Sequence, residues 1–281
     1  MDPTPALIGS AVALVLILAG AALRGPGGRG IPGAVVLGLA PVAAVLATLY
    51  ASGEVVGFPP ARFRDWALLV GVVAWPLGAL SSRGGWSSVV ALAGVLGIAI
   101  YLYAVPTESL HDRDWSGNVT TWVAVLSAAT MVAYGVRIAA AGTGRSMDAN
   151  LATGIVALAA APALGWTGTG VTAFLVAAVS ASAGLFGLYQ FARRSTRSEF
   201  APLDLAAAAP QVVLLSGMLA IGVLYSETPR LAAGMLFGAP LAVLLPGKGL
   251  KGTIVRLVIV AAISGAAVWM CRPEPNPYAG Y

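Results

Sequence analysis

Ten long apolar runs, separated by short segments rich in Gly, Pro and Arg, dominate the hydrophobic pattern of the chain. Each run is continuous for roughly 16–23 residues, about the length that an α-helix needs to cross a bilayer. Strands of a membrane barrel would instead alternate apolar and polar residues over about ten positions. The pattern therefore predicts an all-α polytopic transmembrane bundle in a single membrane domain, residues 1–281. The predicted spans are residues 5–23, 31–51, 66–82, 87–105, 119–141, 150–166, 170–192, 206–225, 230–246 and 252–271.

The composition excludes a water-soluble globule. Hydrophobic residues make up 58% of the chain and charged residues only 10%, with a mean hydropathy of +0.87. Soluble domains carry about 25% charged residues, so this chain lacks the polar side chains to cover itself in water. Its net charge of +5 is scattered over short loops. The expected partner is therefore the lipid bilayer, with no nucleic acid.

The loop charges predict an orientation. Loops that follow odd-numbered spans, with the helix ends beside them, hold eleven basic and three acidic residues, including the cluster Arg193, Arg194 and Arg197. The opposite loops and the two termini hold five basic and eight acidic residues. Because an excess of Arg and Lys marks the cytoplasmic side, we expect a multi-pass protein of the plasma (inner) membrane with both termini outside the cytoplasm.

The two ends of the chain carry no sign of processing or cross-linking. The first run follows Asp2 with no basic residue before it, so we expect a membrane span rather than a cleaved signal peptide. Cys271 is the only cysteine, which excludes an internal disulfide. Its place at the end of the last run predicts a free thiol facing lipid at the membrane boundary.

Two connections resemble copies of one unit. Residues 49–66 and 102–115 each contain a Leu-Tyr pair, then a Glu, then Arg-Asp-Trp. Many transporters contain repeated helical units. The alternative is chance recurrence of an interfacial aromatic residue beside a polar loop, in a chain of biased composition.

The only histidine, His111, lies in a predicted outer loop with Glu108, Asp112 and Asp114. A histidine beside carboxylates is a candidate base or cation ligand. A zinc site generally needs three or four ligands at recognisable spacings, and no second histidine exists. We expect a solvated polar loop with no metal, no cofactor and no catalytic residue.

Ionisable groups within the membrane mark ion-coupled carriers, and no predicted span has one at mid-depth. Arg137 and Arg256 lie about one turn from the predicted cytoplasmic boundary. Long basic side chains near helix ends extend to the interface, so we expect both arginines to be interfacial anchors. The alternative is a site for an anion or a lipid headgroup.

Uncharged polar residues inside the spans are the candidate substrate contacts. Gln211 is a side-chain amide well inside a predicted span, and Ser216 follows it on the same helix. Ser180 and Ser182 lie on another span. Prolines also fall inside spans, and each frees a backbone carbonyl and kinks its helix. Kinked helices line substrate cavities in transporters, although small and polar residues also serve helix packing. The prolines inside spans are Pro41, Pro76, Pro162, Pro210 and Pro240.

Two family resemblances follow from these features. Ten spans in under 300 residues resembles the drug/metabolite-type permeases, a family that places both termini in the cytoplasm, opposite to the charge pattern here. Residues 188–225, with Tyr189-Gln190, a basic loop and Ala209-Pro210, look like the later helices of antiporter-like subunits of respiratory complex I. The intramembrane lysines and glutamate of that family are missing here.

The sequence thus favours a small permease or flippase-like transporter of a neutral or lipid-like substrate, without tight ion coupling. The alternative is a non-catalytic structural or assembly subunit of a larger membrane complex, possibly of respiratory type, with other membrane-protein subunits as partners. An enzyme is a third alternative, which requires His111 and its carboxylates in one outer pocket. If the chain is a transporter, we expect a polar cavity in the membrane region. If it is a scaffold, we expect its helices to pack without such a cavity.

Overall fold

The computed structural model describes residues 2–23, 31–54, 56, 63–84, 116–167, 170–192, 201–225 and 228–273. Nearly all of them are helical, and none of these residues forms a β-strand. The all-α prediction is confirmed for this part of the chain. The predicted span 87–105 and the outer-loop residues Glu108, His111, Asp112 and Asp114 lie outside it, as does the second Arg-Asp-Trp segment, 113–115.

Helices occupy the other nine predicted ranges. They are α1 (Thr4–Leu23), α2 (Ile31–Ala51), α3 (Phe63–Gly84), α6 (Ser116–Gly142), α7 (Ser146–Trp166), α8 (Gly170–Ala192), α9 (Ala201–Tyr225), α10 (Arg230–Gly238) with the 3₁₀ helix η2 (Ala239–Leu244), and α11 (Gly249–Met270). Five helices, α3, α6, α7, α9 and α11, begin three or more residues earlier than predicted. In two of them an acidic residue sits in the first turn, Asp65 in α3 and Asp148 in α7. A negative charge is stabilising at a helix N-terminus.

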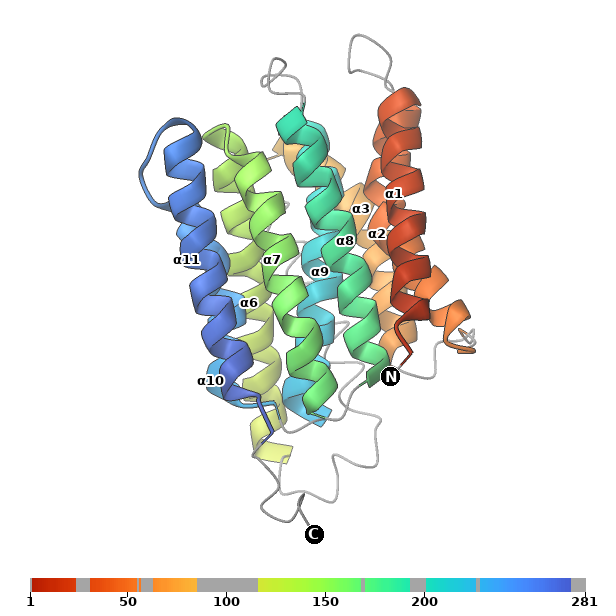
Figure 1. Ribbon diagram of the computed structural model, residues 1–281, viewed down its shortest axis with the longest axis vertical. Helices are drawn as coiled ribbons and strands as arrows, with labels where there is room; N and C mark the ends of the chain where they lie inside the picture. Colours follow the sequence, from red (N-terminus) through yellow and green to blue (C-terminus); the bar gives the residue numbers. More distant parts are fainter. Residues whose placement is uncertain are drawn as a thin grey trace.

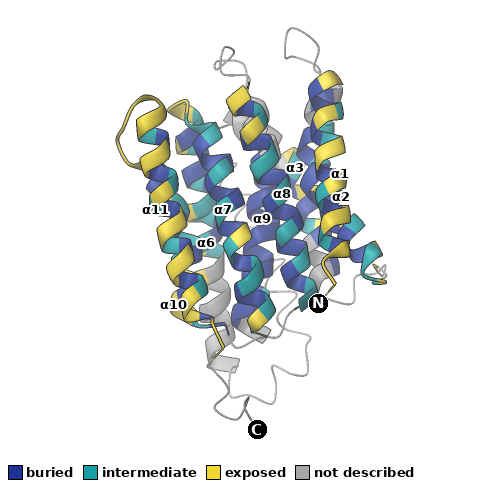
Figure 2. Cartoon of the chain, in the orientation of Figure 1, coloured by how far each residue is buried: buried dark blue, intermediate teal, exposed yellow. Residues whose placement is uncertain are grey.

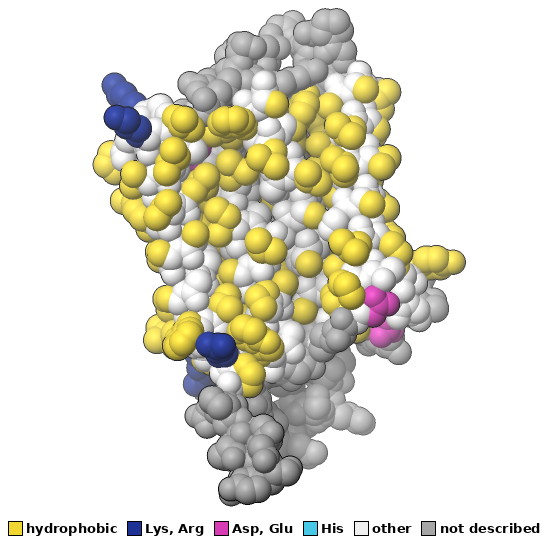
Figure 3. Space-filling view, in the orientation of Figure 1, with side chains coloured by type: hydrophobic (Ala, Val, Ile, Leu, Met, Phe, Trp, Pro, Cys, Tyr) yellow, Lys and Arg dark blue, Asp and Glu magenta, His cyan; other side chains and the backbone are white. Residues whose placement is uncertain are grey.

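Four of the described helices, α1, α7, α8 and α11, are long and apolar enough to cross a membrane. Shorter apolar stretches lie in α2 (Val35–Ala51), in α9 (Ala208–Val223) and over α10 and η2 (Arg230–Leu244). Figure 3 shows one face of the molecule, which is apolar between charged groups at its two ends. This surface suits a bilayer.

The helices run side by side along the long axis, and helices consecutive in the described chain mostly alternate in direction (Figure 1). The first residue of α1 and the last residue of α11 lie at the same end, which we call the lower end; the other is the upper end. At the lower end, Oδ1 of Asp2 accepts hydrogen bonds from the hydroxyl (2.6 Å) and backbone N–H (3.0 Å) of Thr4, which lowers the pKa of its carboxyl.

Helices α7, α8 and α9 form the centre of the bundle, and α1 and α11 lie at its sides with exposed faces (Figure 2). Residues 208–220 of α9 are all buried. Helices α7 and α8 approach closely where the hydroxyl of Ser180 donates to the carbonyl of Gly154 at 2.7 Å. A Cβ on Gly154 would lie 3.0 Å from the backbone of Gly184, so the glycine is what permits this approach.

Four of the predicted span prolines, Pro41, Pro76, Pro162 and Pro210, lie inside unbroken helices. Pro240 is different, because α10 ends at Gly238 and the chain continues as a 3₁₀ helix from Ala239. The predicted span 230–246 therefore consists of an α-helix and a 3₁₀ helix that meet next to Pro240. Proline lacks the N–H that would continue the α-helical bonding, and a 3₁₀ turn accommodates that loss.

The position of Cys271 differs from the predicted lipid-facing thiol. Its side chain is only 6% exposed and packs into the main apolar core, so the thiol does not face lipid. It remains a free cysteine.

Candidate functional site

A buried polar cluster joins four helices near the upper end of the bundle. Arg137 lies on α6, Asn150 on α7, Gln190 on α8 and Gln211 on α9. All four side chains are at most 9% exposed. Nη2 of Arg137 donates to Oδ1 of Asn150 and, at 2.6 Å, to Oε1 of Gln211. Nδ2 of Asn150 then donates to Oε1 of Gln190 at 2.8 Å. A chain of hydrogen bonds thus connects α9 to α8 through Arg137 and Asn150.

Arg137 is a permanent cation, whereas the amides that it contacts, Asn150 and Gln211, are uncharged. These bonds therefore orient the guanidinium without adding negative charge to it. Because the oxygen of Asn150 accepts and its nitrogen donates, the network also determines which way this amide points.

An ion pair lies on the other side of α7. Nε of Arg256 on α11 donates to Oδ2 of Asp148 at 2.9 Å, and Nη2 of the same arginine contacts the same oxygen. Both side chains are buried. Nη1 of Arg256 also donates to the carbonyl oxygens of Gly247 (3.0 Å) and Leu245 (3.4 Å). This pair is internally neutralised and fixes the turn that precedes α11.

Arg145, between α6 and α7, caps the C-terminal end of η2 with its side chain. Its Nη1 lies 3.1–3.3 Å from the carbonyl oxygens of Val243, Leu244 and Leu245. The last carbonyls of a helix lack partners within it, and a basic side chain there satisfies them. Arg145 therefore has a structural role.

The expectation that Arg137 and Arg256 extend to the membrane interface was wrong. They are 4% and 3% exposed, respectively, and both point into the bundle. The physical reason is that buried acceptors on α7 and α9 offer better partners than a longer reach to water. Polar groups in hydrocarbon either find such acceptors or carry a large free-energy cost.

A small inner cavity of about 20 Å³ adjoins Arg137. It lies between α6, α7, α9 and the α10–η2 junction. Thr153 and Ser216 contribute hydroxyls to its lining, and Pro240 lies at its edge. A cavity of this size is close to the roughly 10–15 Å³ that a single water molecule requires. In this conformation the inner cavity therefore holds no substrate larger than water.

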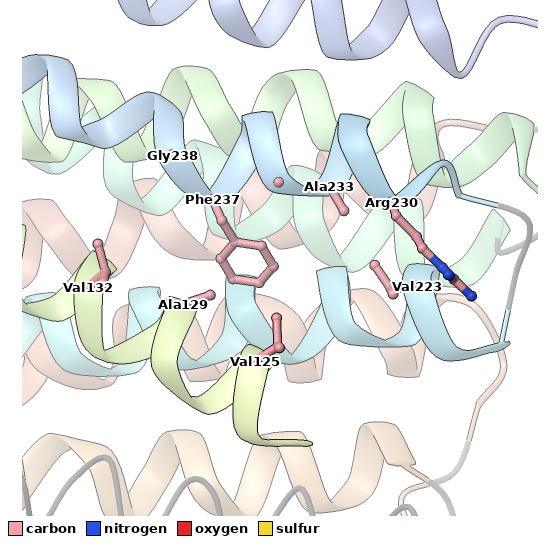
Figure 4. Close-up of a pocket in the computed structure, with 9 residues that line it drawn as sticks. Val125, Ala129, Val132, Val223, Arg230, Ala233, Phe237 and Gly238 are labelled. Atoms are coloured by element: carbon pink, nitrogen blue, oxygen red, sulfur yellow. The ribbon is translucent and has the colours of Figure 1, made fainter. Parts of the chain in front are cut away.

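A larger outer groove of about 270 Å³ opens between α6, α9 and α10 toward the lower end. Figure 4 shows the Phe237 ring projecting from α10 towards α6, with Arg230 at one end of the groove. Its other side chains are apolar: Val125, Ala129, Val132, Val223 and Ala233. The outer groove thus combines an apolar channel with a cation at its mouth.

Phe237 lines both the outer groove and the inner cavity. Three helices, α6, α9 and α10, line both the outer groove and the inner cavity. On α6 the lining residues run from Val125 to Arg137 at helical spacing, and on α9 they run from Val223 to Val212. Eleven or twelve residues of helix span about 16–18 Å, more than half of the roughly 30 Å hydrocarbon core. We call this α6–α9–α10 contact the seam.

The predicted substrate residues fall in two places. Gln211 bonds to Arg137, and Ser216 lines the inner cavity. Ser180 bonds to the backbone of Gly154 between α7 and α8. Ser182, on the same helix, is 1% exposed, and within the described chain its hydroxyl has no hydrogen-bond partner. The structure thus brings Gln211 and Ser216 to the seam and leaves the two serines of α8 at a packing contact.

Sequence reasoning missed Asn150 and Gln190 and misplaced the side chain of Arg137. The predicted span 150–166 begins at Asn150, and Gln190 lies near the end of the predicted span 170–192. The usable signal was that Arg137, Asn150 and Gln190 lie at similar depth on consecutive helices. Within the described ranges, no group of three or more His, Cys, Asp or Glu side chains could hold a metal ion.

No protein-family model, curated protein or solved structure matches this chain. The functional argument therefore rests on the geometry of the seam.

Proposed function

We propose that the chain is a ten-span permease or flippase-like protein that moves a lipid-like or neutral molecule along the seam, without tight ion coupling. The observation that carries the proposal is the position of Phe237, between an open apolar groove and a buried polar cavity. Substrate sites of this kind form at interrupted helices, and α10 is interrupted at Gly238, beside Phe237. In this conformation the path is closed at Phe237.

The proposed orientation places the upper end in the cytoplasm of a plasma (inner) membrane. Among side chains that the structure describes, the upper end has Arg137, Arg145, Lys248, Lys251 and Arg256 against Asp148. The lower end has Arg230 and Arg272 against Asp2, Glu54 and Asp65. This distribution supports the positive-inside orientation, with both termini on the non-cytoplasmic side.

A lipid-translocation assay tests the proposal. The purified protein is reconstituted into phosphatidylcholine and phosphatidylglycerol vesicles that carry a trace of a nitrobenzoxadiazole-labelled phospholipid. Dithionite added outside bleaches only the outer leaflet unless label crosses the membrane. We expect bleaching beyond the outer leaflet, faster in Phe237→Ala and slower in Phe237→Trp.

Phe174→Ala is the matched control, because Phe174 lies on α8 away from both cavities. It removes the same ring without opening the seam. Bleaching that stays at the level of protein-free vesicles in both the unaltered protein and Phe237→Ala would refute a lipid-like substrate.

The second candidate, a structural subunit of a larger complex, is favoured by the size of the inner cavity, which holds about one water molecule. Tight packing behind an open apolar groove also suits a helix of a partner protein. Here the test is the mass of the chain extracted from its native membrane in mild detergent. A complex larger than the isolated chain, lost in Val132→Trp and kept in Val258→Trp on the exposed face of α11, would support this candidate.

A further inference from the structure

The turn between η2 and α11 is exposed on its outside and held by two arginines from its inside. Every residue from 244 to 251 is exposed. Arg145 and Arg256 donate to backbone carbonyl oxygens of the turn, and Arg256 also pairs with Asp148. The backbone of the turn is therefore fixed, and both of these cations already serve the fold.

Two lysines in the same segment have no such structural role. Lys248 and Lys251 are exposed, and neither forms an ion pair with any side chain that the structure describes. Lys248 is the N-cap residue of α11, yet its side chain makes no capping hydrogen bond. A helix N-terminus favours anions over cations, so the helix gains nothing from either charge. Both ammonium groups remain available to an anion from outside the chain.

An apolar stripe leads away from these lysines along α11. Ile254, Val255 and Val258 follow Lys251 at spacings of three, four and seven residues, which places them on the same face of the helix. They are 51%, 55% and 60% exposed. From Lys251 to Val258 the helix rises about 10 Å, within the roughly 15 Å of one leaflet of the hydrocarbon core. Figure 3 shows basic groups above an apolar face, at the corner where Figure 1 has the upper end of α11.

We propose that this surface binds an anionic phospholipid, with its phosphate at Lys248 and Lys251 and one acyl chain along Ile254, Val255 and Val258. We call these five residues the α11 lipid surface.

Charge complementarity identifies the occupant of the α11 lipid surface. Lysines at a membrane boundary attract anionic lipids, whereas the cationic group of a zwitterionic phospholipid cancels that attraction. A soluble anion would leave the apolar stripe uncovered. The α11 lipid surface is separate from the seam, and binding there does not depend on transport.

Lipid-specific fluorescence quenching tests the proposal on the whole protein. Cys271 is replaced by Ser, and a bimane label is attached through Leu250→Cys, an exposed position between the two lysines. The protein is placed in phosphatidylcholine vesicles that contain equal fractions of brominated phosphatidylglycerol or brominated phosphatidylcholine. We expect an apparent affinity at least about tenfold higher for phosphatidylglycerol, from about fivefold for each lysine. Salt should reduce this preference.

Two results of this assay would overturn the proposal. One is equal quenching by the two brominated lipids at low salt. The other is relief of the phosphatidylglycerol quenching by glycerol phosphate, beyond the effect of sodium chloride at equal ionic strength. Glycerol phosphate has the charged group without the acyl chains, so such relief would show that the apolar stripe plays no part.

Variants assign the preference to the two lysines. Lys248→Gln with Lys251→Gln should bring the affinity for phosphatidylglycerol close to that for phosphatidylcholine. Lys248→Arg with Lys251→Arg should retain the preference, because it retains the charges. Arg272→Gln removes one cation at the lower end, where it lies over Trp269, and should leave the preference unchanged. An equal loss in Arg272→Gln and in the double Gln variant would trace the effect to net charge and overturn the proposal.

A second label position tests whether the preference is local. A bimane attached through Leu7→Cys lies on the exposed face of α1, near Asp2 at the lower end. There we expect equal quenching by the two brominated lipids. A phosphatidylglycerol preference at Leu7→Cys as large as that at Leu250→Cys would overturn the assignment to the α11 lipid surface.

Discussion

Nη2 of Arg137 on α6 lies 2.6 Å from Oε1 of Gln211 on α9, and both residues are almost completely buried. Because the donor is charged, this bond is stronger than one between two neutral groups. Gln211 was predicted from the sequence as a substrate contact. The structure gives its amide oxygen a partner inside the bundle, and a role in substrate binding stays a prediction.

Removing the acceptor should destabilise the bundle. Gln211→Leu leaves a buried guanidinium N–H without that oxygen, so we expect a loss of about 1–3 kcal/mol. The loss would appear as a lower thermal unfolding midpoint in detergent. Gln211→Glu retains the acceptor and adds a negative charge beside Arg137, so it should melt at or above the midpoint of the unaltered protein. A Gln211→Leu protein as stable as the unaltered one would contradict the importance of this bond.

The contact between α7 and α8 predicts different results for substitution of two glycines, one on each helix. A Cβ on Gly154 would lie 3.0 Å from Cα and N of Gly184, whereas a Cβ on Gly184 would meet nothing within 4 Å. Gly154→Ala should therefore force the helices apart, at a cost of about 1–3 kcal/mol from overpacking. Gly184→Ala should be neutral or mildly stabilising. Equal effects on the unfolding midpoint would show that the helices do not approach in this way.

The ion pair between Asp148 and Arg256 should behave as a unit. Asp148→Asn or Arg256→Gln alone removes one partner of a buried pair, which typically costs about 3–5 kcal/mol. The double variant, Asp148→Asn with Arg256→Gln, leaves no uncompensated buried charge and should lose less than the two single losses combined. A double-mutant cycle on unfolding midpoints measures the coupling, and additive losses would mean that the two groups do not interact.

Thiol accessibility tests the orientation. In a chain whose buried Cys271 is first replaced by Ser, Lys248→Cys should resist an impermeant maleimide added outside intact cells. Val56→Cys should react, because it is exposed near the opposite end of the bundle. Permeabilised cells provide the control, since both cysteines should then be labelled. Reaction of both positions in intact cells would contradict the ten-span orientation.

Helix positions were largely predictable from the sequence because continuous apolar runs determine them. The starts of α3 and α7 were misjudged, since Asp65 and Asp148 looked like loop residues and belong to first turns. The break at Pro240 could not be told from the pattern. Four other prolines sit in unbroken helices, and local sequence does not distinguish these cases.

The candidate site was less predictable, because it depends on which helices are neighbours. The sequence identified Gln211 and Ser216 as polar residues in an apolar span, and both lie at or beside the seam. The partnership of Gln211 with Arg137 spans 74 residues, and nothing in local periodicity connects them. Whether an arginine near a helix end turns outward or inward depends likewise on acceptors from distant helices.

The partners of α7 are spread widely along the chain. Asn150 bonds to a residue 13 positions away and to another 40 positions away, whereas Asp148 meets its cation 108 positions later. During synthesis on a ribosome, α7 can therefore satisfy its amide as soon as α6 and α8 are present. Its carboxylate stays without Arg256 until α11 has been made. A nascent chain that stops before α11 therefore lacks the cation that pairs with this buried carboxylate.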